Sequence, residues 1–422
     1  MQNREHNRLK KEIAKLAIAQ RIVPRLLILA VLLAFAASPV LAQTELVVWH
    51  GYRGGEKTAF EKVVEAYNGK MAGKVKVKTL AVPYDAYPDK ITAAVPRGKG
   101  PDVFIFAQDR MGGWVEAGNT IEPIDFYLDD ELIGRFIDTT MEAMTYQGTV
   151  YGLPLNYKVI TQIYNKALVK NPPKTSAELV ATAKKLTDKG VGKFGLAYPY
   201  NDFYYHAALM NAFGGGVFDG KRQPIMNKPA NVKALEYMMK WFEKDGILPA
   251  EPSTALITSL FNDGKAGIVF SGPWFLGEVS DSVDVGLAPL PTIDEVGTPM
   301  KPWMTVEGVY VSEPSKHKDE AFDLVVYLTS LEAAKVLALE GRQTPANKAV
   351  YDDADVKKDA TLQAFRAQVA SAVPMPNVPE MTMMWSPATT AMNLIVKGSS
   401  SPGAAMERAQ EEVKERIQAL RQ

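Results

Sequence analysis

Between residues 45 and 106 the sequence alternates strand-like with helix-like segments, and this alternation restricts the possible folds more than any other feature. Residues 45–49 and 102–106 are apolar runs of strand length, and residues 75–79 alternate Val or Thr with Lys, as a half-exposed strand does. Apolar residues at helical spacing follow the first run, at 60–67. Strands separated by helices favour an open, mainly parallel sheet covered on both faces. The sequence therefore predicts the α/β class.

A similar alternation resumes in the second half of the chain. Further strand-like runs lie at residues 162–164, 267–270 and 283–287. A capping box from Thr175 to Glu178 predicts one helix start, residues 319–339 predict two helices with Gly341 as their stop, and Ser401 begins the last helix. A chain of 422 residues is too long for a single compact hydrophobic core, and no linker segment divides it. We therefore expect two α/β lobes joined by short crossings.

The first 42 residues have the pattern of a secretory signal. Residues 1–25 hold seven Lys or Arg and two Glu, and twelve apolar residues follow at 26–37. We expect residues 1–42 to be a signal peptide that is cleaved after Ala42. An uncleaved membrane anchor is the alternative, but the apolar run is short for a span. The chain has no Cys, so a lipidated N-terminal cysteine is not expected, and the predicted location is the periplasm.

Charge and missing motifs exclude several functions. Beyond residue 25 the chain holds 41 basic and 46 acidic side chains, a balance that favours neither nucleic acid nor an anionic membrane as partner. The four His show no metal-binding spacing, and neither a phosphate-binding G-x-x-x-x-G-K-[ST] loop nor a G-x-S-x-G nucleophile motif occurs. We therefore expect no metal, no cofactor and no catalytic residue. The sequence does not exclude the paired carboxylates of a glycosidase, because these residues have to be close in space but not in the sequence.

Four stretches of the sequence carry a family pattern. They are Gly-Pro-Asp at 100–102 with Asp-Arg-Met-Gly-Gly-Trp at 109–114, Ile-Tyr-Asn-Lys-Ala-Leu at 163–168, Phe-Asn-Asp-Gly-Lys at 261–265 with Ser-Gly-Pro-Trp at 271–274, and Met-Pro-Asn-Val-Pro-Glu-Met at 375–381. Each resembles the corresponding stretch of maltose/maltodextrin-binding proteins, and the four keep the family's order over nearly all of the chain after residue 42. The chain is identified as a member of this family of extracellular solute-binding proteins.

The resemblance implies the periplasmic-binding-protein fold, with two discontinuous α/β lobes, a hinge and a ligand cleft between the lobes. We expect residues 43–152 and 306–352 in the N-terminal lobe, and residues 157–302 and 356–422 in the C-terminal lobe. The implied function is not enzymatic. The lobes would close on a saccharide, and the protein, a monomer, would deliver that sugar to an inner-membrane ABC permease complex.

Two predicted strands of the first lobe end in charged residues. Arg53 follows the run at 45–49, and Asp109 and Arg110 follow the run at 102–106. Ligands of open α/β sheets bind beyond the C-terminal strand ends, and planar charged groups suit the hydroxyls of a sugar. The alternatives are a salt bridge between Asp109 and Arg110 themselves and a solvated loop charge for Arg53.

For the second lobe the resemblance implies sugar contacts from Asp202, Tyr204, Trp274 and Trp385. Aromatic rings suit the apolar faces of a sugar ring. Filling of the core is the alternative for the two tryptophans. We assign the neighbouring Phe203 to the core, together with Tyr205.

The sequence departs from the family at residues expected near the sugar. Phe106 replaces a Trp, Lys158 and Tyr52 replace acidic residues, and Thr389 replaces an Arg; Phe106 and Lys158 are also candidate ligand contacts. The sugar is therefore left open among maltose or maltodextrin, another disaccharide such as trehalose, and a monosaccharide. A different polar solute and a periplasmic glycosidase are the alternative functions.

Overall fold

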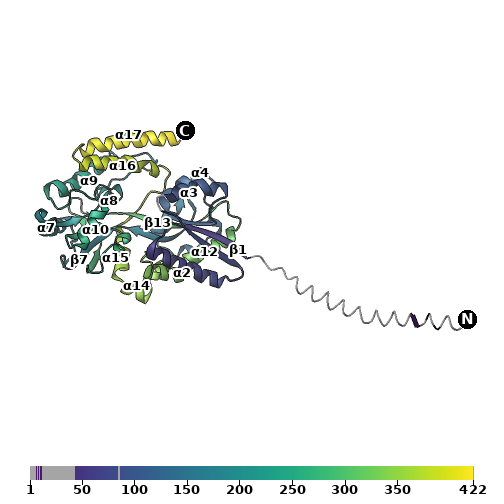
Figure 1. The fold of residues 1–422 in the computed structure, drawn as a ribbon. Helices are drawn as coiled ribbons and strands as arrows, with labels where there is room; N and C mark the ends of the chain where they lie inside the picture. The colour runs from purple at the N-terminus through teal and green to yellow at the C-terminus, as the bar shows by residue number, and fades with distance from the viewer. Residues whose placement is uncertain (1–5, 7, 9, 12–42, 84–85, 422) are drawn as a thin grey trace. The chain divides into compact units, whose positions relative to one another are not determined.

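Helices surround two larger β-sheets in residues 45–422, which make up one compact unit (Figure 1). The described residues also form two two-stranded sheets, β4 (Thr145–Tyr146) with β5 (Thr149–Val150) and β11 (Thr292–Ile293) with β12 (Thr298–Pro299). The structure is a computed structural model that describes residues 6, 8, 10–11, 43–83 and 86–421. The predicted signal peptide, 1–42, lies almost entirely outside the described residues. The two sheets confirm the α/β class.

Within the described residues the larger sheet has the order β14–β13–β3–β1–β2, and β6 also pairs with β13. Its strands are β1 (Thr44–His50), β2 (Val75–Ala81), β3 (Val103–Ala107), β6 (Leu153–Val159), β13 (Trp303–Val311) and β14 (Val373–Pro374). Strands β1 and β3 are parallel, as the alternation predicts. However, β13 runs antiparallel to both β3 and β6, so the sheet is mixed.

The larger sheet is buried on both faces at its central strand β3, because alternate residues of this strand enter different apolar clusters. Val103 and Ile105 of β3 belong to the cluster that includes the apolar face of α2 (Gly54–Lys70). Phe104, between them, belongs to a second cluster and packs edge-to-face on Trp114 at 5.6 Å between ring centroids. A continuous apolar strand such as β3 therefore has no solvent-facing side.

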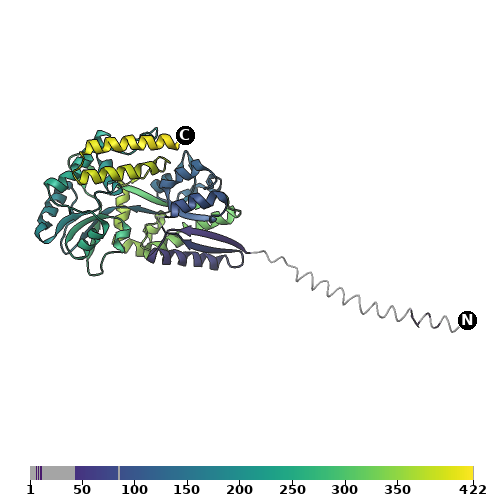
Figure 2. The ribbon, with the colours of Figure 1, turned by 45° about the horizontal axis from the view of Figure 1, so that its top comes forward.

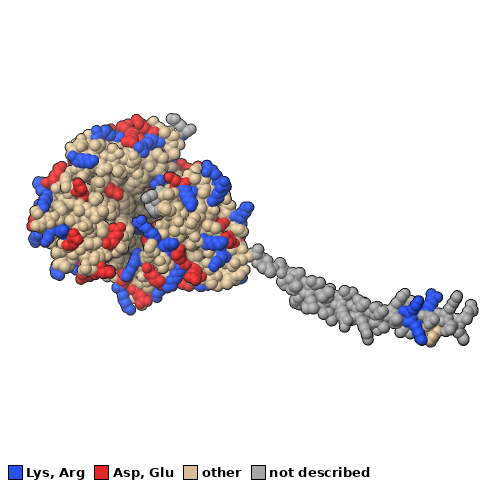
Figure 3. All heavy atoms as spheres, viewed as in Figure 1, with Lys and Arg blue, Asp and Glu red and all other residues tan. Residues whose placement is uncertain are grey.

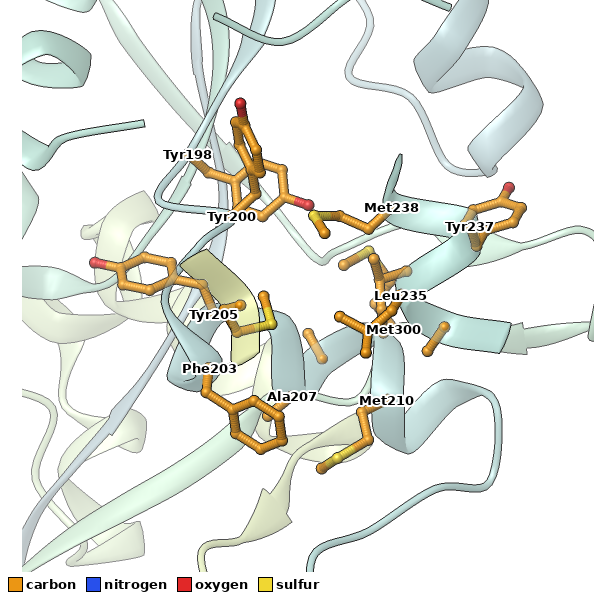
Figure 4. Packing of buried hydrophobic residues seen from close by; sticks show 14 of the residues in the cluster. Tyr198, Tyr200, Phe203, Tyr205, Ala207, Met210, Leu235, Tyr237, Met238 and Met300 are labelled. Carbon is orange, nitrogen blue, oxygen red and sulfur yellow. The ribbon is translucent and has the colours of Figure 1, made fainter. Parts of the chain in front are cut away.

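The smaller sheet has the order β10–β7–β9–β8. Its strands are β7 (Thr161–Asn165), β8 (Phe194–Ala197), β9 (Ala266–Ser271) and β10 (Val285–Ala288). Strands β8 and β9 are parallel, whereas β7 runs antiparallel to β9 and to β10. One face of the sheet packs on the extensive cluster drawn in Figure 4, which contains Phe203 and Tyr205 and so confirms their assignment to the core.

The larger helices surround these sheets. They are α3 (Tyr87–Ala94), α4 (Met111–Ala117), α7 (Ser176–Leu186), α8 (Phe203–Ala212), α9 (Pro229–Met239), α10 (Thr254–Asn262), α12 (Lys318–Leu328), α13 (Leu331–Leu339), α15 (Ala360–Gln368), α16 (Met381–Val396) and α17 (Pro402–Leu420). The last two lie side by side in both ribbon views and pack on α8 and α9 (Figures 1 and 2). The shorter helical elements that the site uses are η3 (Gln108–Arg110) and α11 (Pro273–Leu276).

The predicted helix ends are mostly confirmed. The Thr175 side chain accepts from the Glu178 N–H at 3.2 Å, but the Glu178 carboxylate accepts from the Lys174 N–H rather than from Thr175, so the box is shifted by one residue. Gly341 follows α13 as predicted, but without a positive φ. A Cβ there would lie 2.8 Å from the Leu337 carbonyl oxygen, so close packing requires glycine at this position.

The chain passes between the sheets over very short distances. Only Ile160 separates β6 from β7. At the start of β13, Trp303 is buried in the cluster beside the smaller sheet, while Val309 further along the same strand lies in the core of the larger one. Between β3 and the first half of β13, the buried Gln108 donates to the Met375 carbonyl at 3.1 Å and accepts from the Val306 N–H at 2.8 Å. The boundaries expected for the two lobes stay a prediction.

Candidate functional site

A pocket of about 770 Å³ is lined in part by residues at or just after the C-terminal ends of β3, β8 and β9, the edge at which α/β sheets bind ligands. The lining residues are Ala107, Asp109, Arg110, Lys158, Pro199, Asn201, Asp202, Tyr204, Pro252, Ser253, Thr254, Trp274, Thr305, Glu307, Met375, Trp385 and Thr389. Its volume lies in the range of pockets that enclose small organic ligands.

Most of the predicted site residues line this one pocket. They are Asp109, Arg110, Lys158, Asp202, Tyr204, Trp274 and Trp385. Arg53 is exposed at the start of α2 and is not among the lining residues. Phe106 is also not among them, because its ring is buried beneath β3 between Tyr87 and Trp114. The binding roles of all nine residues stay predictions.

Asp109 and Arg110 are presented by η3, which continues directly from β3. The Arg110 Nε lies 3.4 Å from the Asp109 Oδ2, so the salt bridge that the sequence offered as an alternative is present, and both side chains also line the pocket. Asp109 is 7% exposed. Burial raises the pKa of its carboxyl to about 6, and the charge of Arg110 offsets part of this effect.

Lys158 of β6 is held between two carboxylates. Its Nζ lies 3.1 Å from Oε1 of Glu307 and 3.5 Å from Oε1 of Glu56. Burial raises the pKa of Glu56, while the nearby ammonium group of Lys158 acts in the opposite direction. The charge of Lys158, which replaces an acidic residue of the family pattern, is therefore neutralised by these two carboxylates.

Behind this ion pair, Tyr52 donates a hydrogen bond of 3.0 Å to the Glu307 Oε2. Burial, reinforced by the charge of Glu307, raises the pKa of Tyr52 well above its usual range, so the phenol stays protonated as a donor. Asn156 donates to the Tyr52 oxygen at 3.3 Å and to the Gln343 Oε1 at 2.6 Å. This series of hydrogen bonds therefore fixes the position of the Glu307 carboxylate.

Three aromatic side chains, Tyr204, Trp274 and Trp385, also line the pocket. Tyr204, at the start of α8, lies 6.1 Å from Trp274 of α11 between ring centroids, and Trp385 of α16 packs edge-to-face on the buried Trp303 at 5.8 Å. A Cβ on Gly272 would lie 2.2 Å from the Trp274 ring. Glycine at this position therefore lets the indole fold back beside the chain.

Asp202 caps α8, and its Oδ1 accepts from the Tyr204 N–H at 2.8 Å. Burial raises the pKa of this carboxyl, and the same N–H acts against that rise. Capping fixes one carboxylate oxygen, and the side chain still lines the pocket.

The sequence reasoning missed Glu307, together with Thr305 and Asn201. Glu307 is 8% exposed within an otherwise apolar strand. A single acidic residue in such a strand is a signal for a special environment, since buried carboxylates need partners. Neither its partners nor the pocket can be found from the pattern alone.

In the part of the chain that the structure describes, no group of three His, Asp or Glu is placed to hold a metal ion. The described helices also include none with the length and apolar character to cross a membrane. On the face drawn in Figure 3, basic and acidic side chains are interspersed. A pocket of this size at the strand ends of an α/β fold is typical of ligand-binding proteins.

Known proteins extend this classification. The chain is similar to the maltotriose-binding protein of Pyrococcus abyssi (strain GE5 / Orsay), at 33% identity over 89% of this chain and 83% of that protein. It is similar to the galactooligosaccharide-binding protein of Bacillus subtilis (strain 168), at 30% identity over 89% of this chain and 90% of that protein. Among solved structures it matches a cyclo/maltodextrin-binding protein complexed with maltotetraose, with a TM-score of 0.80, 31% identity, and coverage of 89% of this chain and 98% of that one.

Residues 53–335 match the family described as bacterial extracellular solute-binding protein, and the chain belongs to that family. The identification made from the sequence motifs is therefore confirmed, and so is the periplasmic-binding-protein fold. Because the family consists of non-catalytic solute-binding proteins, the prediction that the chain is not an enzyme is also confirmed.

Proposed function

We propose that the protein binds an oligosaccharide in this pocket and delivers it to the permease of an ABC importer. The observation that carries the proposal is that the pocket wall combines charged side chains from η3, β6, β13 and the start of α8 with aromatic rings from α8, α11 and α16. A sugar ring offers hydroxyl groups around its edge and C–H groups on its faces, so it needs both kinds of surface. The similar proteins named for maltotriose and for galactooligosaccharides agree with this ligand class.

In this proposal the carboxylates and cations bind hydroxyl groups and the rings stack on the sugar. The proposed contacts are Asp109, Arg110, Lys158, Asp202, Tyr204, Trp274 and Trp385. Replacing Trp274 or Trp385 with Ala should weaken sugar binding by roughly 1–3 kcal/mol with the fold intact. Phe126→Ala is the control, because this ring is 96% exposed and does not line the pocket. Unchanged affinity in both tryptophan variants, measured by calorimetry, would show that the pocket is not the binding site.

A maltodextrin is the finer ligand proposed, and a galactooligosaccharide is the second candidate, supported by the relative of 30% identity. A thermal-shift screen over maltose, maltotriose, maltotetraose, trehalose and galactotriose tests both, since a ligand that binds only the folded state raises Tm. The largest shift should come from maltotriose or maltotetraose. If no saccharide shifted Tm or gave a calorimetric signal, the proposal would be wrong.

Export to the periplasm is part of the same proposal and rests on the pattern of residues 1–42. Mass spectrometry of the periplasmic fraction should find a chain that begins at Gln43. A membrane-bound protein that retains residues 26–37 would contradict it.

Closure of the two proposed lobes would convert binding into a signal for the permease. Sugar that touches both lobes binds the closed form better, and only this difference shifts the equilibrium. The expected result is a smaller radius of gyration in small-angle scattering when sugar is added, with no sugar hydrolysed. A tightly bound sugar that left the scattering profile unchanged would contradict closure but not binding.

A further inference from the structure

The larger sheet has a second, smaller pocket at the edge opposite the first one. Its volume is about 250 Å³, and it is lined by Glu45 near the start of β1, Asp102 directly before β3 and Ser312 directly after β13. Because β13 runs antiparallel to β3, its end lies beside the start of β3, and the Ser312 N–H donates to the Asp102 carbonyl at 2.9 Å. The proposed sugar contacts Asp109 and Arg110 follow the other end of β3. The second pocket is therefore separate from the proposed sugar site.

The side chain of Ser312 is buried in this pocket without a hydrogen-bond partner. The residue is 1% exposed and lines the pocket, and its Oγ has no partner among the residues that the structure describes. Buried hydroxyl groups in folded proteins nearly always form a hydrogen bond, because leaving one unmade is unfavourable. The hydroxyl of Ser312 therefore points to a ligand in the pocket that completes its hydrogen bonding.

The helix α12 begins at the same pocket. Its cap residue, His317, lines the pocket, and the His317 side chain accepts no hydrogen bond from the first turn of the helix. The exposed Lys316 also lines the pocket and forms no ion pair with any described residue. The first N–H groups of a helix have no acceptor within it and carry a partial positive charge, so they favour an anion. The ammonium group of Lys316 favours the same kind of ligand.

The two carboxylates of the pocket are already engaged by groups of the protein. Oε2 of Glu45 lies 2.7 Å from the Lys78 Nζ. Asp102 accepts from a backbone N–H of β1 at 2.9 Å with one oxygen, and from a hydroxyl group at 2.7 Å with the other. The groups that are left for a ligand are therefore chiefly donors, namely the Ser312 hydroxyl, the Lys316 ammonium group and the start of α12.

We propose that this second pocket binds a small oxyanion of the size of inorganic phosphate. The anion accepts from the Ser312 hydroxyl, from Lys316 and from the first N–H groups of α12. It thereby connects the end of β13 to the start of the helix that follows, and it stabilises the folded chain because the unfolded chain has no such site. The inference goes beyond the proposed function, since none of these groups lines the sugar pocket.

The test measures Tm of the full exported chain over a series of inorganic phosphate concentrations, with sodium chloride keeping the ionic strength constant. Tm should rise and then level off, which gives a dissociation constant for phosphate. Ser312→Ala removes the hydroxyl without breaking a hydrogen bond within the described residues, so in phosphate-free buffer this variant should be as stable as the unaltered protein. In Ser312→Ala and in Lys316→Gln the dissociation constant should rise by roughly tenfold or more.

Lys397→Gln is the matched control, because it removes the same charge from an exposed lysine that lines neither pocket. Its dissociation constant for phosphate should equal that of the unaltered protein. Phosphate also stabilises proteins in general by its exclusion from their surface, and that effect would raise the Tm of all variants equally. An equal rise in all variants, or no rise beyond that in sodium chloride, would overturn the inference. Sugar affinity, measured separately by calorimetry, should be unchanged in Ser312→Ala, so the proposed function stands or fails independently of this site.

Discussion

Arg421, which follows α17, donates a hydrogen bond of 2.8 Å to Oε1 of Glu380, the residue that precedes α16. Glu380 is only 2% exposed, and Arg222 is its second cationic neighbour, with Nε 3.6 Å from the same oxygen. Arg222 also donates to Glu116 at 2.7 Å. The end of one helix is thereby fastened to the start of its antiparallel neighbour through a buried charge.

Replacing Arg421 with Ala should lower the free energy of unfolding by about 1–3 kcal/mol, because a buried carboxylate loses its hydrogen-bond donor. The measurement is denaturant unfolding at pH 7. Lys414→Ala is the control, since its pair with Glu411 is exposed and should contribute at most about 1 kcal/mol. Equal effects of the two substitutions would show that Arg222 alone is sufficient to stabilise the buried carboxylate of Glu380.

Sugar affinity should fall as the pH drops below about 6. The pKa of Asp109 is raised to about 6, and a carboxylate that accepts hydroxyl donors binds sugar better than its protonated form. Sugar affinity is therefore highest above this pH, and below it the affinity declines by at most tenfold per pH unit. Asp109→Asn should bind more weakly at pH 7.5 and lose most of the dependence measured by calorimetry between pH 5 and 7.5. The same slope in this variant would assign the dependence to Asp202 or Glu56, whose pKa values are also raised.

Acid should destabilise the fold through His206. Burial in α8 lowers the pKa of this imidazole from 6.5 to about 3. Below pH 6.5 the unfolded chain binds a proton that the folded chain excludes, so this contribution to stability is present above pH 6.5 and is lost as the pH falls toward 3.

Between pH 6.5 and 4.5, each fall of one pH unit should then lower the free energy of unfolding by up to about 1.4 kcal/mol through this residue. His206→Leu should show a correspondingly shallower loss of unfolding free energy over this range, in parallel denaturant titrations. His317→Leu, a change of a half-buried surface histidine, is the control. Parallel curves for the unaltered protein and His206→Leu would contradict the prediction.

Gly272→Ala should weaken sugar binding by displacing Trp274. The added Cβ would lie 2.2 Å from the indole ring, which has to move because the backbone is anchored at the end of β9. We expect a loss comparable to Trp274→Ala, roughly 1–3 kcal/mol by calorimetry. Gly277→Ala is the matched control on the same helical turn, where the nearest atom would lie at an ordinary 3.7 Å. If Gly272→Ala and Gly277→Ala both bound sugar as tightly as the unaltered protein, the position of Trp274 would not matter for affinity.

The local pattern of the sequence was sufficient for the strands and helices that follow it closely. The alternation of residues 75–79 predicts β2, and the polar break before Leu331 predicts the boundary between α12 and α13. Helix α16 shows the limit. It continues through Pro387, which removes a backbone hydrogen bond, because its buried face packs on α17 and α8. Tertiary burial outweighs the local signal there, and so the direction of Trp385 was not predictable from its neighbours.

The candidate site was predictable only in part for a similar reason. Residues next to strand ends, such as Asp109, can be placed by the rule for α/β sheets. Glu307 lies 149 positions beyond its partner Lys158, and pairing over such a distance leaves no local mark. Phe106 follows the same rule as Asp109, yet the strand's alternation turns its ring into the core.

The place of β13 in the larger sheet has a consequence for how the chain matures. This strand lies between β3 and β6 but starts only at residue 303, so a chain lengthening from its N-terminus has both partner edges exposed until more than two thirds of it has emerged. Contacts of such sequence separation form slowly, because a long loop must be closed first. The order of the strands thus delays completion of the fold, and it leaves the emerging polypeptide dependent on protection from aggregation until its last third arrives.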